Sequence, residues 1–191
     1  NSVSKTFKQS WWQKKGTANH SNGGIITAVD GVSFTCVPGR IFGLIGPNGA
    51  GKTTTLRMIA TMLQPTSGTI HVCDTDVVTN PMKVRQKMGF LSGNTGLYDR
   101  LTAEEMVRYF ADLHGMSKEA YQSRRDELFS MLGMEEFARR RISKLSSGMK
   151  QKVSIARTII HNPEVVVFDE PTTGLDVITS KNIIQLIKHC K

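Results

Sequence analysis

The chain carries the run Gly46-Pro-Asn-Gly-Ala-Gly-Lys-Thr53, which fits the pattern G-x-x-x-x-G-K-S/T. An apolar run, Ile41-Phe-Gly-Leu-Ile45, comes directly before it and predicts a buried strand. Residues 54–63 follow it without a Gly or Pro and predict a helix. A strand, a glycine-rich loop and a helix in this order predict a loop that holds the phosphates of a nucleotide.

The chemistry of such a loop follows from its small residues and its single lysine. Glycines let backbone N–H groups converge on an anion, and the helix that follows adds the partial positive charge of its N-terminus. We expect Lys52 to reach the β- and γ-phosphates and Thr53 to offer its hydroxyl to Mg²⁺. An ordinary glycine-rich turn is the alternative, but four fixed positions seldom match by chance in one chain. The predicted nucleotide contacts of this loop are Gly46, Pro47, Asn48, Gly49, Ala50, Gly51, Lys52, Thr53 and Thr54.

The composition fits a single globular domain. The chain has 191 residues, of which 39% are hydrophobic and 21% charged. No apolar run approaches the roughly 20 residues that span a bilayer, and no signal peptide opens the chain, so we expect a soluble protein. Cys36, Cys73 and Cys190 are scattered, which favours a reducing cytosol over a disulfide framework or a zinc site. The net charge of +9 is spread along the chain, so no nucleic-acid partner is expected.

The N-terminal part predicts β structure. Val3-Ser-Lys-Thr-Phe7 is expected to end a first strand, and residues 8–24 to form a surface loop. Two β-rich runs, 25–29 and 32–37, flank Asp30-Gly31, a dipeptide that predicts a hairpin turn.

The middle of the chain changes from strands to helices. Short strands are expected at 69–73 and 88–91. Thr102-Ala-Glu-Glu105 predicts a capping box, Ser117 can cap a second helix, and Met134 to Arg140 predicts a third and shorter one. Because strand character returns at Glu164-Val-Val-Val-Phe168, these helices form an insertion between two stretches of sheet. A last helix is expected from Asp176 to Lys191.

An acidic pair, Asp169-Glu170, follows the apolar strand that ends at Phe168. Ligands bind at the carboxyl ends of strands in open α/β sheets, so this pair is expected beside the nucleotide. Asp169 would hold the Mg²⁺ shell, and Glu170 would orient and deprotonate the attacking water. Two carboxylates that merely cap a strand are the alternative, which the phosphate loop disfavours.

Between these motifs lies Leu145-Ser-Ser-Gly-Met149, which leads into a predicted helix. Taken alone it indicates a helix cap, although its N–H groups and hydroxyl could also receive a phosphate.

Together the motifs resemble the ATP-binding subunit of an ABC transporter. Residues 46–53 match that family's Walker A motif, 165–170 its Walker B motif, and 171–176 its D-loop region. Residues 145–149 resemble its signature motif, with Ser147 for the usual first glycine and Met149 for the usual glutamine. Residues 91–102 and the signature look most like sodium-extrusion, NatA-type subunits of ABC-2 exporters.

The resemblance implies an α/β fold. A phosphate-loop NTPase core with a mostly parallel sheet would carry an N-terminal antiparallel β subdomain and an inserted helical subdomain. The expected boundaries within a single, C-terminally truncated domain (1–191) are 3–45 for the β part, 46–92 and 163–191 for the core, and 93–162 for the helical subdomain.

The resemblance also implies an ATP-dependent homodimer packed head to tail. Ser146 and Gly148 of one copy, together with Asp176, would complete the ATP site that Lys52 forms in the other copy. Such a subunit is a cytoplasmic ATPase that sits on the cytoplasmic face of the membrane and powers an integral-membrane permease. Its substrate class would be sodium, a drug or another small molecule.

This sequence departs from the family at three places. The glutamine of the Q-loop falls at Gly93, with Asn94 as a possible substitute. Phe7 aligns with the aromatic residue that stacks on adenine, although Trp11 or Trp12 could serve instead. The switch histidine is missing, since His189 lies within the expected last helix, so this fragment is expected to hydrolyse ATP poorly.

Two other function classes fit the sequence less well. A soluble ABC-type ATPase that acts on ribosomes or nucleic acid would explain the basic charge, but such proteins usually fuse two cassettes or insert a long coiled coil. A phosphate-loop kinase for a small molecule would leave the signature motif and the Asp169-Glu170 pair unexplained.

Overall fold

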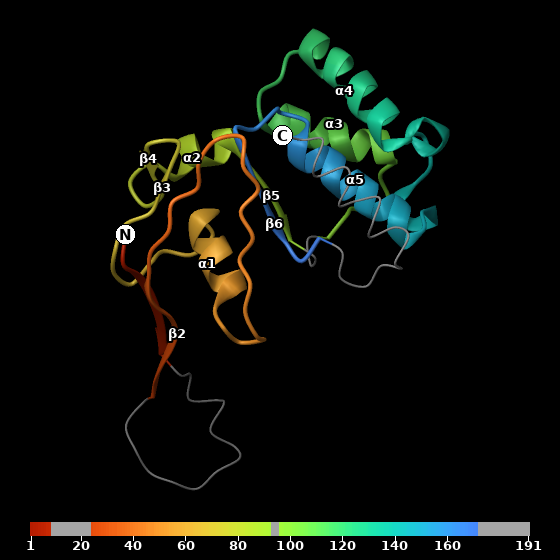
Figure 1. Ribbon diagram of the computed structural model, residues 1–191. Coiled ribbons are helices and arrows are strands. Elements are labelled where there is room, and N and C mark those ends of the chain that lie inside the picture. Colours follow the sequence, from red (N-terminus) through yellow and green to blue (C-terminus); the bar gives the residue numbers. More distant parts are fainter. Residues whose placement is uncertain (9–23, 93–95, 172–191) are drawn as a thin grey trace, which may run out of the picture. The chain divides into compact units, whose positions relative to one another are not determined.

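The computed structural model describes residues 1–8, 24–92 and 96–171 (Figure 1). The described chain divides into two compact units, one comprising residues 1–85 and the other beginning at residue 86. Each unit has its own buried core and its own pairs of strands. None of the helices in these residues combines the length and apolar character needed to cross a bilayer. The predicted loop over residues 8–24 and the last helix, 176–191, lie largely outside the described residues.

The first unit begins with an antiparallel pair of strands. β1 (Val3–Lys8), which was predicted, pairs with β2 (Ile25–Val32). The predicted hairpin at Asp30-Gly31 is wrong, because both residues lie inside β2. The register shifts between the pairs Val3–Val32 and Lys5–Val29, and Gly31 has φ 57°, which is the left-handed conformation that a bulge requires.

The predicted buried strand at 41–45 is also wrong. Residues 33–51 are irregular, and the side chains of Ile41, Phe42 and Ile45 are 57%, 53% and 95% exposed. A run of apolar residues becomes a strand only when a neighbouring strand accepts and donates its ladder hydrogen bonds. In the described part of the first unit, β2 pairs with β1 and no strand pairs with this run.

The remaining elements of the first unit are short. α1 (Lys52–Ile59) ends earlier than predicted, since Thr61 adopts φ 61° and its carbonyl and hydroxyl oxygens both accept from the Arg85 guanidinium. Val3, Val29 and Met58 form the buried core beneath it. The strand predicted at 69–73 is a small hairpin of β3 (His71–Val72) and β4 (Thr75–Asp76), followed by α2 (Pro81–Lys87).

The second unit confirms the predicted helical insertion. β5 (Met88–Ser92) and β6 (Val165–Asp169) pair in parallel. The chain between them forms α3 (Ala103–Leu113), α4 (Lys118–Leu132), η2 (Glu135–Phe137), η3 (Ile142–Lys144) and α5 (Ser147–Ile159). The third predicted helix, Met134 to Arg140, is only the short 3₁₀ turn η2.

Side-chain caps determine where these helices begin. Thr102 and Glu105 form the predicted capping box, in which the Thr102 hydroxyl accepts from the Glu105 amide at 3.2 Å and the Glu105 carboxylate accepts from the Thr102 amide at 2.8 Å. At α4 and α5 one half of this arrangement is present, because the hydroxyls of Ser117 and Ser146 accept from the amides of Ala120 and Met149. Such caps satisfy amides that have no partner within the helix, which stabilises each helix by about 1 kcal/mol.

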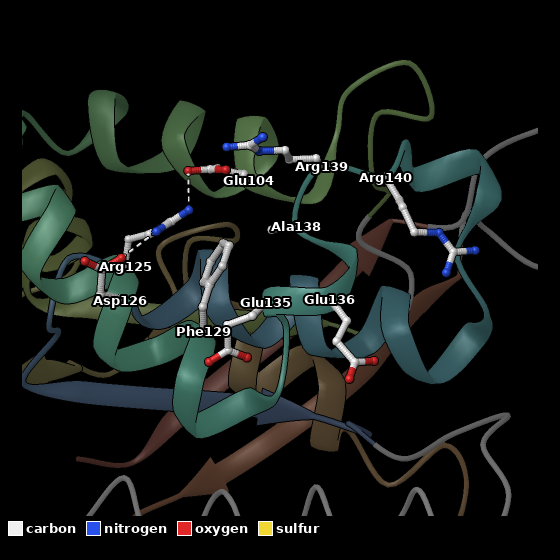
Figure 2. A pocket seen from close by; sticks show the side chains of 9 residues that line it. All are labelled: Glu104, Arg125, Asp126, Phe129, Glu135, Glu136, Ala138, Arg139 and Arg140. Atoms are coloured by element: carbon white, nitrogen blue, oxygen red, sulfur yellow. Dashed lines mark hydrogen bonds and ion pairs between the residues drawn. The ribbon is translucent and has the colours of Figure 1, made fainter.

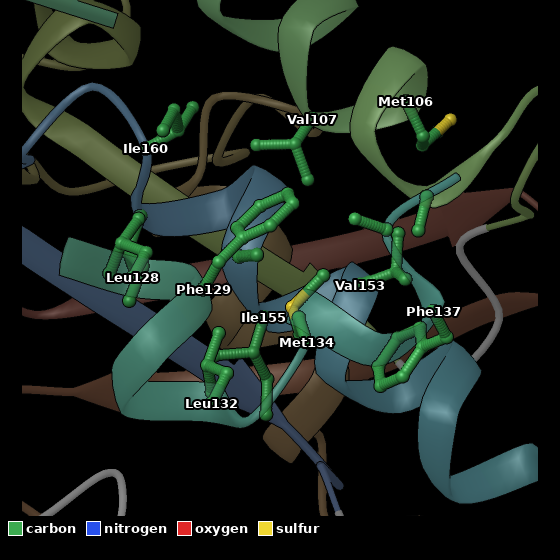
Figure 3. Close-up of a cluster of buried hydrophobic side chains, with 14 of the residues drawn as sticks. Met106, Val107, Leu128, Phe129, Leu132, Met134, Phe137, Val153, Ile155 and Ile160 are labelled. Carbon is green, nitrogen blue, oxygen red and sulfur yellow. The ribbon is translucent and has the colours of Figure 1, made fainter. Parts of the chain in front are cut away.

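The helices of the insertion pack around one apolar core (Figure 3). α5 contacts α3, α4 and β5, so this helix organises the second unit. The largest fully buried side chains of the second unit come from α3, α4, η3 and α5, from β5, and from residues that flank these helices. They include Leu91, Met106, Leu128, Phe129, Met134, Ile142, Ile155 and Ile160.

Candidate functional site

The phosphate loop lies at the surface of the first unit and leads into α1. Gly46 to Ala50 are exposed, and Gly51 to Thr54 are half-buried. The Ala50 amide donates to the Pro47 carbonyl at 3.2 Å, which makes the tip of the loop a turn. Gly49 and Gly51 adopt φ 82° and 81°, conformations that side chains rarely tolerate. The predicted nucleotide contacts of this segment are therefore contiguous and exposed to a ligand.

Gly51 lies where no larger residue would fit. A Cβ atom at this position would come within 2.2 Å of the Ala28 carbonyl oxygen in β2. Gly51 also precedes the first residue of α1, and the Thr55 amide donates to its carbonyl at 2.8 Å. The glycine thus allows the loop to turn sharply into a helix whose first turn holds no acidic residue. A helix start of this kind favours an anion.

Lys52 folds back over the loop that precedes it. Its ammonium group donates to the carbonyls of Gly46 and Pro47, each at 2.9 Å. These bonds hold a positive charge against the loop. Lys52 therefore provides the cation that the sequence predicted in this loop.

The acidic pair of the second unit stands at the end of β6. Asp169 is the last residue of that strand and is 7% exposed, whereas Glu170 is exposed. Asp169 pairs with Ser92, the last residue of β5. Both parallel strands therefore deliver their carboxyl ends to one edge, which is where the sequence predicted these carboxylates.

Glu170 has an unusual backbone. Its φ is 54°, in the left-handed region that non-glycine residues seldom occupy. It also precedes Pro171, and a residue before proline normally stays extended. Such a conformation costs on the order of 1–3 kcal/mol and persists only where neighbouring groups hold it.

The signature segment forms the start of α5, as predicted. The Ser146 hydroxyl accepts from the Met149 amide at 3.3 Å, and Ser146 and Ser147 are exposed. No acidic residue stands in the first turn, which leaves the partial positive charge of the helix uncompensated by a carboxylate there. The Ser146 hydroxyl can still donate its own proton to a ligand.

Two residues beside this site were not singled out in the sequence. The Gln151 side-chain amide, on α5, donates to the Pro171 carbonyl at 2.6 Å. Arg157 is 3% exposed, stacks 4.9 Å from the Phe110 ring centroid and donates to the Gly96 carbonyl at 3.2 Å. Burial lowers the pKa of Arg157. No sequence signal identifies either partner, because both contacts join distant parts of the chain.

Several predicted residues stay untested. Gly93, Asn94, Trp11, Trp12 and His189 lie outside the described residues, as does Asp176. Phe7 is 39% exposed at the end of β1, and the Lys5 ammonium lies 5.2 Å from its ring centroid. Its contact with adenine remains a prediction.

A hollow of about 500 Å³ in the second unit lies between the start of α3, α4 and η2 (Figure 2). Its lining combines acidic and basic side chains, and Arg125 forms ion pairs with Glu104 and Asp126. Phe129 forms part of its wall. None of the predicted nucleotide residues lines it, so it is not the predicted ATP site.

The donor groups fit a magnesium ion in chemical type. Mg²⁺ prefers oxygen ligands and is usually held by one or two carboxylates together with substrate phosphates. The Asp169 carboxylate and the Thr53 hydroxyl supply such oxygens. Within the described residues no cluster of three or more His, Cys, Asp or Glu could hold an ion without a substrate.

This sequence is similar to those of two bacterial ATP-binding proteins. NatA, an ABC transporter ATP-binding protein of Bacillus subtilis, is 48% identical over 87% of this chain and 68% of its own length. The linearmycin resistance ATP-binding protein LnrL of the same organism is 35% identical over 85% of this chain. The chain spans only about half of LnrL, at 52%.

A solved structure shares the fold. The dimeric ATP-binding cassette MJ0796, in a post-hydrolysis state with ADP and Pi bound, superposes with a TM-score of 0.80. It is 30% identical, and the match covers 97% of this chain and 79% of that one. The likeness confirms the predicted phosphate-loop α/β fold.

The sequence model of the ABC transporter family matches residues 29–173. This range includes the phosphate loop, the signature segment and the Asp169-Glu170 pair. The chain therefore belongs to the ABC transporter family, as one of its ATP-binding and ATP-hydrolysing subunits.

Proposed function

We propose that two copies of this chain close head to tail around ATP and thereby drive an exporter. The observation that carries the proposal is the phosphate loop, where Lys52 lies over the carbonyls of Gly46 and Pro47 at the start of an α-helix. On binding, the γ-phosphate would accept from Lys52 in place of those carbonyls. The dimeric state of the MJ0796 cassette supports the pairing.

The residues divide into binding and hydrolysis roles. The backbone of Gly46 to Thr54 binds the phosphates, and Lys52 supplies the charge that discriminates triphosphate from diphosphate. Glu170 orients the attacking water and accepts its proton. A bound Mg²⁺, held by Thr53 and Asp169, would neutralise charge on the phosphates.

The start of α5 would complete the site of the other copy. Ser146, which is exposed, and Gly148, which is half-buried, stand at a helix N-terminus whose first turn holds no acidic residue, and this arrangement suits a γ-phosphate presented by a second subunit. Asp176 would contribute from the D-loop region. Closure then depends on ATP, since its phosphates bridge the two halves.

The transport partner is an integral-membrane permease, and the chain would sit on the cytoplasmic face of the membrane. NatA, the linearmycin resistance protein and a Nod factor export ATP-binding protein support an export role. We propose sodium or a small organic molecule as the exported substrate. The same relatives argue against a ribosomal or nucleic-acid role.

Light scattering on the full chain tests the dimer. We expect Glu170→Gln to bind ATP without turning it over and to double in mass when ATP and Mg²⁺ are added. Glu164→Gln, at an exposed carboxylate before β6, serves as the matched control and should remain monomeric once its ATP is consumed. A Glu170→Gln protein that binds ATP and never pairs would refute the head-to-tail proposal.

A further inference from the structure

One hydrogen bond joins the signature helix to the end of the Walker B strand. The Gln151 side-chain amide donates to the Pro171 carbonyl at 2.6 Å, and both residues are half-buried. Gln151 lies one turn beyond the start of α5, and Pro171 directly follows Glu170. This contact spans 20 residues of sequence, so it depends on tertiary structure.

Glu170 is the residue for which this bond matters. Its φ of 54° and its place before a proline are both unfavourable for a glutamate. The proline ring fixes φ between Glu170 and the Pro171 carbonyl, so anchoring that carbonyl restricts how far the Glu170 backbone can relax to an extended conformation. Because the Glu170 side chain follows its backbone, relaxation there would move the carboxylate.

We infer that Gln151 is a positioning residue, which anchors the Pro171 carbonyl, one residue beyond Glu170, so that the Glu170 carboxylate points at the attacking water. The inference rests on the proposed role of Glu170 as the base. It assigns Gln151 no contact with ATP. Its effect is on the geometry of a group that must lie within hydrogen-bond reach of the water.

The same bond also connects the start of α5 to the backbone next to Glu170. The first turn of this helix holds Ser146 and Gly148, which are proposed to receive the phosphate bound by the other subunit. A helix transmits a shift of its first turn to its next turn, where Gln151 stands. Engagement of the signature segment in one site is thus linked to the base of the other site by one helix turn and one hydrogen bond.

The test is the kinetics of Gln151→Met in the full chain, because methionine keeps the length of the side chain and removes its donor. We expect kcat for ATP to fall about tenfold, since small misplacements of a catalytic group cost one or two orders of magnitude in rate. KM and the affinity for ATP should change less than about twofold, because the phosphate loop is untouched. Gln151→Glu should lower kcat further, since its carboxylate repels the Pro171 carbonyl oxygen.

Two measurements separate positioning from general destabilisation. Gln122→Ala, at an exposed glutamine of α4, should leave kcat unchanged. In a Glu170→Gln background, Gln151→Met should add no further loss to the single-turnover rate, because the base on which it acts is already gone.

The outcomes are distinct. Unchanged kcat in Gln151→Met, or equal losses with and without Glu170, would overturn the inference and leave the proposed function standing. A wild-type chain that neither binds nor hydrolyses ATP would overturn both.

Discussion

The phosphate-loop segment (residues 33–51) and the helical insertion (residues 96–160) are built in opposite ways. The insertion is a set of capped helices around a core whose members are almost fully buried. The loop segment is irregular and largely exposed, and its shape depends on Gly49, Gly51 and the two bonds from Lys52. One region is organised by packing and the other by local backbone conformation.

This contrast separates two kinds of mutational effect. Substitutions in the insertion should lower the free energy of unfolding and leave ATP affinity intact. Substitutions in the loop should lower the affinity for ATP and leave the free energy of unfolding nearly unchanged, because few packed side chains are lost there. The contrast would fail if a single substitution lowered both the free energy of unfolding and the affinity for ATP.

The largest effect is expected for Phe129→Ala in α4. Phe129 is 1% exposed, so the substitution removes a buried ring and leaves a cavity. We expect a loss of about 4 kcal/mol of unfolding free energy, measured by urea denaturation. Met131→Ala, at a 43% exposed position of the same helix, is the control and should cost far less.

Lys52→Ala should abolish tight ATP binding. Removal of a charge-assisted contact to phosphate is worth about 3 kcal/mol, which corresponds to roughly a 100-fold loss of affinity in titration calorimetry. The urea midpoint should hardly move. Lys83→Ala, at an exposed position on α2, should bind ATP as the wild type does. Unchanged affinity in Lys52→Ala would remove the basis of the phosphate-site assignment.

A smaller effect is expected from pH. The His161 ring stacks on His114 with centroids 3.5 Å apart, and burial followed by the charge of His114 lowers the pKa of His161 from 6.5 to about 4. Between these values the unfolded chain binds a proton that the folded chain does not. The contribution of His161 to stability should therefore fall as pH drops from about 6.5 to about 4, and then level off. With solvent screening of the half-buried ring allowed for, the loss is on the order of 2 kcal/mol.

Thermal unfolding across this pH range measures the effect. His161→Gln should flatten the pH dependence, because it removes the imidazole whose pKa folding lowers. A dependence that survives in His161→Gln would assign the proton to other groups.

The sequence correctly predicted those parts of the molecule whose structure depends on residues nearby in the sequence. The caps Thr102, Ser117 and Ser146 satisfy amides three residues away, and each helix begins where its cap predicted. The acidic pair could be placed because β6 is a short apolar run bounded by Asn162-Pro163. In all these cases the deciding interaction lies within one or two turns of the chain.

Predictions that needed a distant partner were less successful. The run 41–45 is as apolar as β6, yet only β6 pairs with another described strand. Asp30-Gly31 has the composition of a turn, but its pairing with β1 makes it a bulge instead. Gln151 and Arg157 escaped notice for the same reason, since each contacts a carbonyl far away in the sequence.

The two ends of the helical segment 102–141 meet. The Ala103 amide donates to the Arg140 carbonyl at 3.1 Å and the Glu104 amide to the Ala138 carbonyl at 2.9 Å, while Thr102 and Arg141 form a β-bridge. A segment that leaves and re-enters a fold at one point can change in length at little cost in loop-closure entropy. This junction is therefore a natural splice point, where evolution or an engineer can exchange α3, α4 and η2 for another module that covers the same apolar face of α5.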